Sequence, residues 1–167
     1  MFFNNPEPEP LYVSRSDESN PLGSFSRHGF ALDDADWPTV EHYFQGMKFT
    51  DPGQRAAIRN MASPTEAQQL AEKHVRAVRK DWKKIQQTVM TRGLYIKCLT
   101  HPEVAKALLM TDTREIVESA DLPQSLIFFI SSKQLKDEVF SPFSSTSSIF
   151  RYPLIARWIM EAVRLLF

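Results

Sequence analysis

The chain has 167 residues, with 20 Lys and Arg against 20 Asp and Glu, 43% hydrophobic residues and one cysteine. This composition predicts one globular domain, and it excludes wholesale disorder, an intramolecular disulfide and a zinc site built from several cysteines. The balanced charge argues against duplex nucleic acid held by charge alone, because such binding depends on neutralising phosphates. No apolar stretch reaches the roughly 20 residues of a bilayer-spanning helix, and no basic residue precedes Arg15. We therefore expect no secretory signal, no membrane partner and a cytoplasmic location.

The first part of the chain predicts an arm followed by short strands. Residues 1–20 are expected to be an arm, Pro- and Glu-rich over residues 1–10, in which residues 11–13 could be a first strand. Apolar residues 30–32 and Trp37 flank the acidic, turn-rich segment 33–36, which favours a small hairpin.

From Pro38 the pattern is helical, and each expected helix begins at a capping signal. The expected caps are Thr39 for a helix through Met47, Asp51 for a helix to about Met61, Ser63 in a capping box, Asp81 for a longer helix, and Thr100 in a second capping box. Residues 114–118 could then form a short strand because they include two adjacent β-branched residues.

The composition changes after Ser119. Residues 119–152 are an atypical segment rich in Ser and Phe, and residues 153–167 recover the period of an amphipathic helix. We therefore divide the chain into the arm, a core over residues 21–118, the atypical segment and the C-terminal helix, all in one domain.

The densest group of reactive side chains lies at the start of the first expected helix. Glu41, Gln45 and Lys48 are spaced i, i+4, i+7 and share one helix face, which could line a pocket. A solvated helix surface over an aromatic core is the alternative, and spacing does not decide between them. His42 could be an acid or base or could be packed, and Cys98 is expected to be a buried thiol. No metal-ligand spacing is present, so we assign no metal and no cofactor.

A basic stretch surrounds the start of the fourth expected helix. It contains Lys73, Arg76, Arg79, Lys80, Lys83 and Lys84, with Trp82 among them. Arg and Lys side chains could meet a phosphate beside the indole ring, whereas a solvated charge run and a core tryptophan are the alternatives.

Three segments of the chain resemble one family. Residues 37–45, read as Trp-Pro-Thr-Val-Glu-His-Tyr-Phe-Gln and followed by Lys48 and Phe49, resemble the signature of the YbiA-like NADAR family of N-glycosidases. Residues 23–26 are similar to the Gly-x-Phe-Ser segment of that family, and residues 79–82 with 89–92 resemble its tryptophan-bearing long helix. The resemblance covers about residues 21–118 and implies an α+β fold, mostly helical, with a small β-sheet.

The resemblance also implies an activity. It implies a hydrolase that cleaves a ribosyl C–N bond in phosphoribosylamino-pyrimidine intermediates of riboflavin synthesis and releases ribose 5-phosphate. Other family members act on ADP-ribose derivatives, so the alternative substrate is ADP-ribosylated guanine, including in modified nucleic acid. Glu41 matches the catalytic glutamate of the family, and we expect its carboxylate to face a cavity near Trp82. The expected substrate-binding residues are Phe25, Ser26, Trp37, Gln45, Lys48, Arg79, Lys80 and Trp82.

The sequence departs from the family pattern after Glu118. The family carries a further aspartate in an Asp-x-Tyr-Trp-Gly segment followed by a Gly- and Asn-rich loop, whereas Asp121 of this chain lacks that motif around it. The change fits a divergent or frameshifted C-terminus. A catalytically impaired or binding-only protein is therefore a third alternative.

Overall fold

The computed structural model describes residues 9–112, 114, 116–119 and 129–130. Its elements, in chain order, are β1 (Leu11–Ser14), β2 (Phe30–Leu32), β3 (Ala35–Trp37), α1 (Val40–Gly46), α2 (Pro52–Arg59), α3 (Pro64–Lys73), the short 3₁₀ helix η1 (Val75–Ala77), α4 (Trp82–Thr100), α5 (Pro102–Leu109), β4 (Ile116–Ser119) and β5 (Phe129–Ile130). Asp121, most of the atypical segment and the expected C-terminal helix lie outside the described residues. The elements confirm an α+β fold that is mostly helical with a small sheet.

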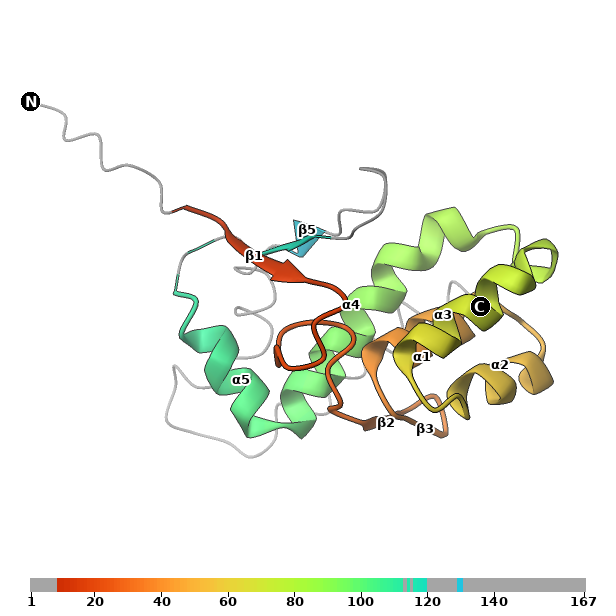
Figure 1. The fold of residues 1–167 in the computed structure, drawn as a ribbon, viewed down its shortest axis with the longest axis horizontal. Helices are drawn as coiled ribbons and strands as arrows, with labels where there is room; N and C mark the ends of the chain where they lie inside the picture. The colour runs from red at the N-terminus through yellow and green to blue at the C-terminus, as the bar shows by residue number, and fades with distance from the viewer. Residues whose placement is uncertain (1–8, 113, 115, 120–128, 131–167) are drawn as a thin grey trace, which may run out of the picture.

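The three-stranded sheet joins the two ends of the described chain. β1 pairs in parallel with β4, from Leu11 opposite Ile116 to Ser14 opposite Ser119, and β4 pairs antiparallel with β5. The strand order is β1-β4-β5. A parallel pair needs a long crossover, and here the crossover contains every helix of the described residues (Figure 1). The position of β1 therefore depends on strand pairing with residues that follow the last described helix.

The expected hairpin forms from β2 and β3, with Phe30 opposite Trp37 and Leu32 opposite Ala35. The turn is shorter than the expected segment 33–36, because Ala35 and Asp36 belong to β3. Asp33 and Asp34 adopt φ values of 54° and 56°. Two successive residues with positive φ fit the twist of a tight hairpin, and Asp tolerates that conformation better than most residues.

Three of the expected helix caps are confirmed. The Thr39 hydroxyl accepts a hydrogen bond from the backbone N–H of His42 at 3.2 Å and caps α1. Asp51 accepts from the backbone N–H of Gln54 at 2.8 Å at the start of α2. Ser63 accepts from the backbone N–H of Glu66 at 3.2 Å at the start of α3. Each cap satisfies a backbone donor that has no partner inside its helix.

The other two expected caps are not confirmed in full: Asp81 occupies the N-cap position of α4 without a capping bond, and Thr100 is wrong as the cap of α5. The Asp81 side chain makes no capping hydrogen bond, because its carboxylate accepts hydrogen bonds of 2.6 and 2.9 Å from the Arg79 guanidinium. Thr100 is the last residue of α4, and its hydroxyl donates to the Ile96 carbonyl at 2.8 Å. The N-cap position of α5 belongs instead to His101, whose side chain makes no capping bond. A neighbouring arginine in one case and the preceding helix in the other override the capping signals.

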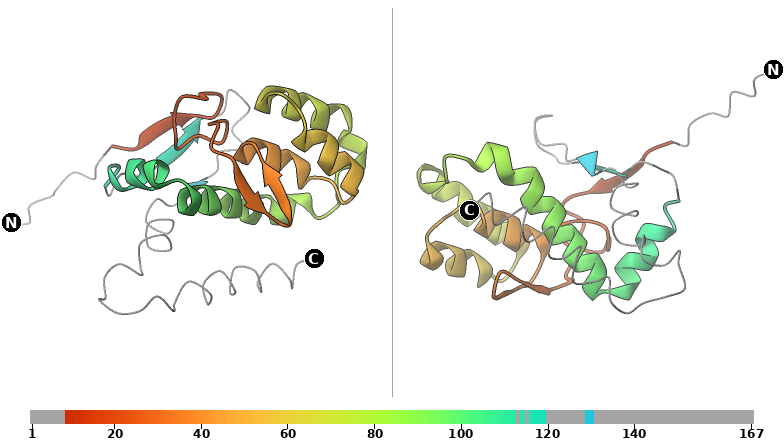
Figure 2. Two further views of the ribbon diagram at one scale, coloured as in Figure 1. Left: turned by 90° about the horizontal axis from the view of Figure 1, so that it is seen from below. Right: turned by 180° about the vertical axis from the view of Figure 1, so that it is seen from behind.

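Helix α1 is surrounded by other helices of the described chain. It packs against α2, α3 and α4, and Figures 1 and 2 show α2 and α3 at one end of the molecule with α5 and β1 toward the other. Its apolar residues Val40, Tyr43, Phe44 and Met47 join a core that includes Trp37 and residues of α4. Within the described part of the chain, no helix is long and apolar enough to cross a membrane.

The last residue of α1 is a glycine for a packing reason. A Cβ atom at Gly46 would lie 2.8 Å from two ring carbons of Trp37, closer than real Cβ contacts. The Trp37 indole is buried, and its N–H donates to the Leu32 carbonyl at 3.0 Å, so the ring has little freedom to shift.

We therefore expect Gly46→Ala to lower the free energy of unfolding by about 1–3 kcal/mol, the usual effect of overpacking a filled core. Urea unfolding followed by tryptophan fluorescence measures the change. Gly53→Ala in the first turn of α2 is the matched control, because there the added methyl group meets only the Asp51 side chain, at 3.1 Å. Equal stabilities of the two variants would contradict the packing role of Gly46.

Candidate active site

The carboxyl group expected to be catalytic is placed by the first turn of α1. Glu41 follows Val40, the first residue of the helix, and its backbone N–H donates to the Ser24 carbonyl at 3.0 Å. A carboxylate near a helix N-terminus is stabilised by the helix dipole. The Glu41 side chain is 0% exposed, so the alternative of a solvated surface for this face of the helix is wrong.

A buried arginine holds one oxygen of this carboxylate. Arg15, which directly follows β1, donates to Glu41 Oε2 from Nε at 3.1 Å and from Nη2 at 2.7 Å. The arginine is 7% exposed. Two donors converging on one oxygen fix the orientation of the carboxylate. Sequence analysis missed Arg15. The one available signal is that it is the only basic residue before Pro21, immediately after an expected strand.

The other carboxylate oxygen is held from the same helix face. Gln45 Nε2 donates to Glu41 Oε1 at 2.6 Å, which confirms that these two residues meet across one turn. The Ser24 hydroxyl lies 3.5 Å from Glu41 Oε2. Glu41 thus has polar partners from the segment after β1, from the loop at Ser24 and from α1 itself.

Aromatic rings and a second cation adjoin this pair. The Phe44 ring has the Arg15 guanidinium 5.2 Å and the Lys48 ammonium 5.7 Å from its centroid. Its centroid lies 4.9 Å from that of the Trp82 ring, in an edge-on arrangement. Trp82 is 9% exposed and belongs to the core. Trp82 therefore reaches the surroundings of Glu41 through Phe44. The expected cavity beside the carboxylate stays a prediction.

The Lys48 ammonium lies in a partly buried and electrostatically mixed environment. Burial lowers the pKa of Lys48 below its ordinary value, Arg15 lowers it further, and Glu41 and Glu72 oppose the shift. A lysine with a lowered pKa loses its proton more readily and also binds an anion with less water to displace.

The loop of residues 23–26 is held from α4. Lys97, which is 0% exposed, donates from Nζ to the Gly23 carbonyl at 2.8 Å and to the Ser26 hydroxyl at 3.2 Å. The Ser26 hydroxyl also donates to the Gly23 carbonyl at 2.9 Å, and Phe25 is buried. Phe25 and Ser26 thus belong to the loop that presents Ser24 to Glu41. Lys97 is a second positioning residue that sequence analysis missed, because it lies far from this loop in the sequence.

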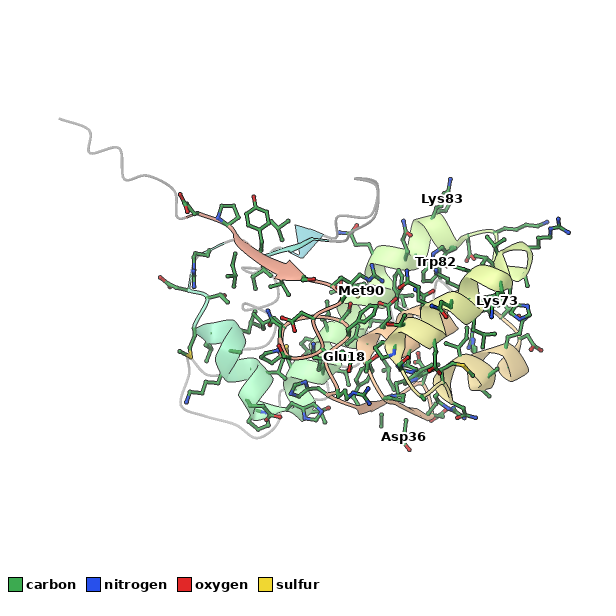
Figure 3. All side chains as sticks on the ribbon, in the orientation of Figure 1. Glu18, Asp36, Lys73, Trp82, Lys83 and Met90 are labelled. Carbon is green, nitrogen blue, oxygen red and sulfur yellow. The ribbon has the colours of Figure 1, made fainter. Side chains whose placement is uncertain are left out.

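Two of the expected substrate-binding residues make side-chain contacts away from Glu41, and a third is exposed to solvent. Trp37 packs in the core against Tyr43, with ring centroids 5.4 Å apart. The Arg79 guanidinium is bonded to Asp81, and the Lys80 side chain is exposed. Figure 3 shows that Lys83 also projects away from the molecule, whereas the neighbouring Trp82 lies among the helices. Most of the basic stretch is a solvent-facing surface, as the alternative interpretation stated.

The remaining reactive side chains are used structurally. His42 Nδ1 lies 2.8 Å from the Thr39 hydroxyl and Nε2 lies 3.2 Å from the Met61 carbonyl, while burial lowers the pKa of the imidazole. The Cys98 thiol is buried, which raises its pKa to about 11 and confirms the expected inert thiol. Among the described residues, no group of three or more His, Cys, Asp or Glu side chains could hold a metal ion.

Comparisons with known proteins identify the family of this chain. The NADAR domain profile matches residues 2–124. The chain is 33% identical over 110 residues to the N-glycosidase YbiA of Escherichia coli (strain K12), covering 66% of this chain and 69% of the relative. It is 31% identical over 114 residues to the chloroplastic riboflavin biosynthesis protein PYRR of Zea mays, covering 59% of this chain and 18% of that protein.

The fold has a solved counterpart. The NMR structure of the E. coli protein YbiA matches with a TM-score of 0.71 at 22% identity, and the match covers 86% of this chain and 93% of that one. Likeness at this level of identity concerns the fold alone. The profile match and the similarity to a curated N-glycosidase show more: the chain belongs to the NADAR domain family and is an enzyme of the glycosidase class.

Proposed function

We propose that this enzyme hydrolyses the N-glycosidic bond of a phosphoribosylamino-pyrimidine and releases ribose 5-phosphate. The observation that carries the proposal is the buried Glu41 carboxylate, which donors from Arg15 and Gln45 hold in one orientation. The riboflavin biosynthesis name of one relative supports an aminopyrimidine as the leaving group.

The reaction exchanges a carbon–nitrogen bond for a carbon–oxygen bond. As the bond between the anomeric carbon and nitrogen breaks, its electron pair leaves with the nitrogen, which takes up a proton. The oxygen of a water molecule then bonds to the anomeric carbon and gives up a proton. Positive charge develops on the sugar between these events, and a preorganised carboxylate stabilises it. We assign this catalytic role to Glu41.

The surrounding residues supply the recognition in this proposal. The Lys48 ammonium makes no ion pair or hydrogen bond within the part of the chain that the structure describes, so it is free there to meet the substrate phosphate. Trp82 and Phe44 provide the aromatic side of the site. Arg79 and Lys80 receive no direct role. The Arg79 guanidinium forms an ion pair with Asp81, and the Lys80 side chain faces solvent.

The substrate is tested by offering purified protein a phosphoribosylamino-pyrimidine and an ADP-ribosylated guanine, with products identified by mass spectrometry. Ribose 5-phosphate from the first compound supports the proposal. Cleavage of the second compound alone would replace the proposed substrate by the alternative one. Binding of either compound without cleavage would indicate the binding-only protein.

Glu41→Gln keeps the shape of the side chain but removes its charge. We expect kcat/KM for the phosphoribosylamino-pyrimidine to fall by at least about 100-fold, the usual loss when a group that stabilises the transition state is removed. The matched control is Glu18→Gln, because Glu18 accepts a hydrogen bond of 2.8 Å from Arg27 in an exposed version of the same kind of pair. A Glu41→Gln enzyme with full activity refutes the assignment.

Arg15→Met removes the cation that holds Glu41. An unpaired buried carboxylate is strongly unfavourable, so we expect the free energy of unfolding to fall by about 3–5 kcal/mol, while Arg27→Met in the exposed pair changes it by about 0–1 kcal/mol. Urea unfolding measures both values.

The double variant Arg15→Met with Glu41→Gln completes the test of this pair. It should be more stable than Arg15→Met alone, because no buried charge remains without its partner. Additive losses in the double variant would show that the two side chains do not interact as the structure indicates.

A further inference from the structure

The amide of Gln45 has one atom without a partner. The side chain is 2% exposed, and its Nε2 donates to Glu41 Oε1 at 2.6 Å. The other amide atom, Oε1, is buried and accepts no hydrogen bond from any residue that the structure describes. A buried acceptor left in this state is unfavourable, so such an atom in a functional region points to a missing donor.

The orientation of this amide follows from its neighbours. Glu41 accepts two hydrogen bonds from Arg15 on Oε2, and a carboxylate offers acceptor oxygens but no donor. Gln45 must then turn its NH₂ group toward Glu41, and its carbonyl oxygen is left facing elsewhere. A flipped amide would place two acceptors against each other. The unpaired Oε1 is thus a consequence of how Glu41 is held.

We infer that Gln45 Oε1 accepts a hydrogen bond from the 2-hydroxyl of the substrate pentose and makes the enzyme specific for ribose over 2-deoxyribose. This inference rests on the proposed function, in which the anomeric carbon faces Glu41. The oxygen and nitrogen of one amide group are close together, and the Gln45 nitrogen binds Glu41. A substrate hydroxyl that reaches Oε1 therefore lies beside the substrate atom that faces Glu41. On a pentose, the hydroxyl beside the anomeric carbon is the one on C2.

This arrangement discriminates against 2-deoxyribose, because a sugar without a 2-hydroxyl leaves Gln45 Oε1 without a hydrogen-bond donor. A site built to hydrogen-bond a hydroxyl rejects the analogue that lacks it much more strongly than an apolar pocket rejects a missing methylene group. In glycoside hydrolysis, a hydrogen bond to the 2-hydroxyl also strengthens as the sugar becomes cationic. One amide would therefore position the catalytic carboxylate with its nitrogen and select the sugar with its oxygen.

The test compares the binding of ribose 5-phosphate and 2-deoxyribose 5-phosphate to the full-length protein by calorimetry. We expect the deoxy sugar to bind the unmodified protein about 5- to 150-fold more weakly, the range for a buried acceptor left without a donor. In Gln45→Met, which has similar volume and no acceptor, the two sugars should bind with nearly equal affinity. Because the readout is a ratio, a general disturbance of Glu41 affects both sugars and cancels.

Gln68→Met is the matched control. Gln68 also donates from Nε2 to a glutamate one turn later, Glu72, but in an exposed setting, so this variant should keep the full preference for ribose 5-phosphate. Equal binding of the two sugars to the unmodified protein, an unchanged preference in Gln45→Met, or failure of both sugars to bind would overturn the inference. Turnover of the phosphoribosylamino-pyrimidine by the unmodified protein separately decides the proposed function, so the two failures can be told apart.

Discussion

The ion pair between Arg15 and Glu41 is the contact on which the candidate site depends. It joins the segment after β1 to the first turn of α1, and both side chains are almost completely buried. Arg15 can reach Glu41 only when β1 is in place, and β1 is held by its parallel pairing with β4. The pairing of two short strands at opposite ends of the described chain therefore sets the position of an arginine in the site. The site and the sheet should form together as the protein folds.

A buried ion pair is weak evidence for stability, because removing two charges from water opposes their attraction. In this site the ion pair serves to fix the orientation of the Glu41 carboxylate. Arg15 and Gln45 each bind a different oxygen of Glu41, and Ser24 contributes a hydroxyl near one of them. Lys97 in turn binds the loop that carries Ser24. A carboxylate held from several elements cannot rotate away as charge develops on a substrate, and such preorganisation is the main source of electrostatic catalysis.

Local sequence signals predicted the features that depend on neighbouring residues. Thr39, Asp51 and Ser63 cap their helices as expected, and the spacing of Glu41 and Gln45 predicted that they share a face. The errors occur where a distant or adjacent side chain competes. Arg79 takes the carboxylate of Asp81 away from the helix terminus. Spacing alone also left open whether Glu41 faces solvent, because burial depends on what packs against the helix.

The polar partners of the site could not be found in this way. Arg15 and Lys97 contact residues far away in the sequence, and no periodic pattern links positions brought together by a parallel strand pair or by a loop lying against a helix. The family resemblance identified Glu41 and Trp82, but not the arginine that orients the carboxylate. Long-range polar contacts were therefore the part of the site that only the structure supplied.

The basic stretch around the start of α4 contacts the candidate site through its backbone more than through its charges. The backbone N–H of Arg79 donates to the Lys48 carbonyl at 2.9 Å, which ties the segment before α4 to the residues just after α1. This bond helps to fix the backbone from which Lys48 extends toward Phe44. The guanidinium of Arg79 is meanwhile engaged by Asp81. A basic run in the sequence can thus help to place a different cation, Lys48, over the Phe44 ring, while exposed members such as Lys80 and Lys83 remain in solvent.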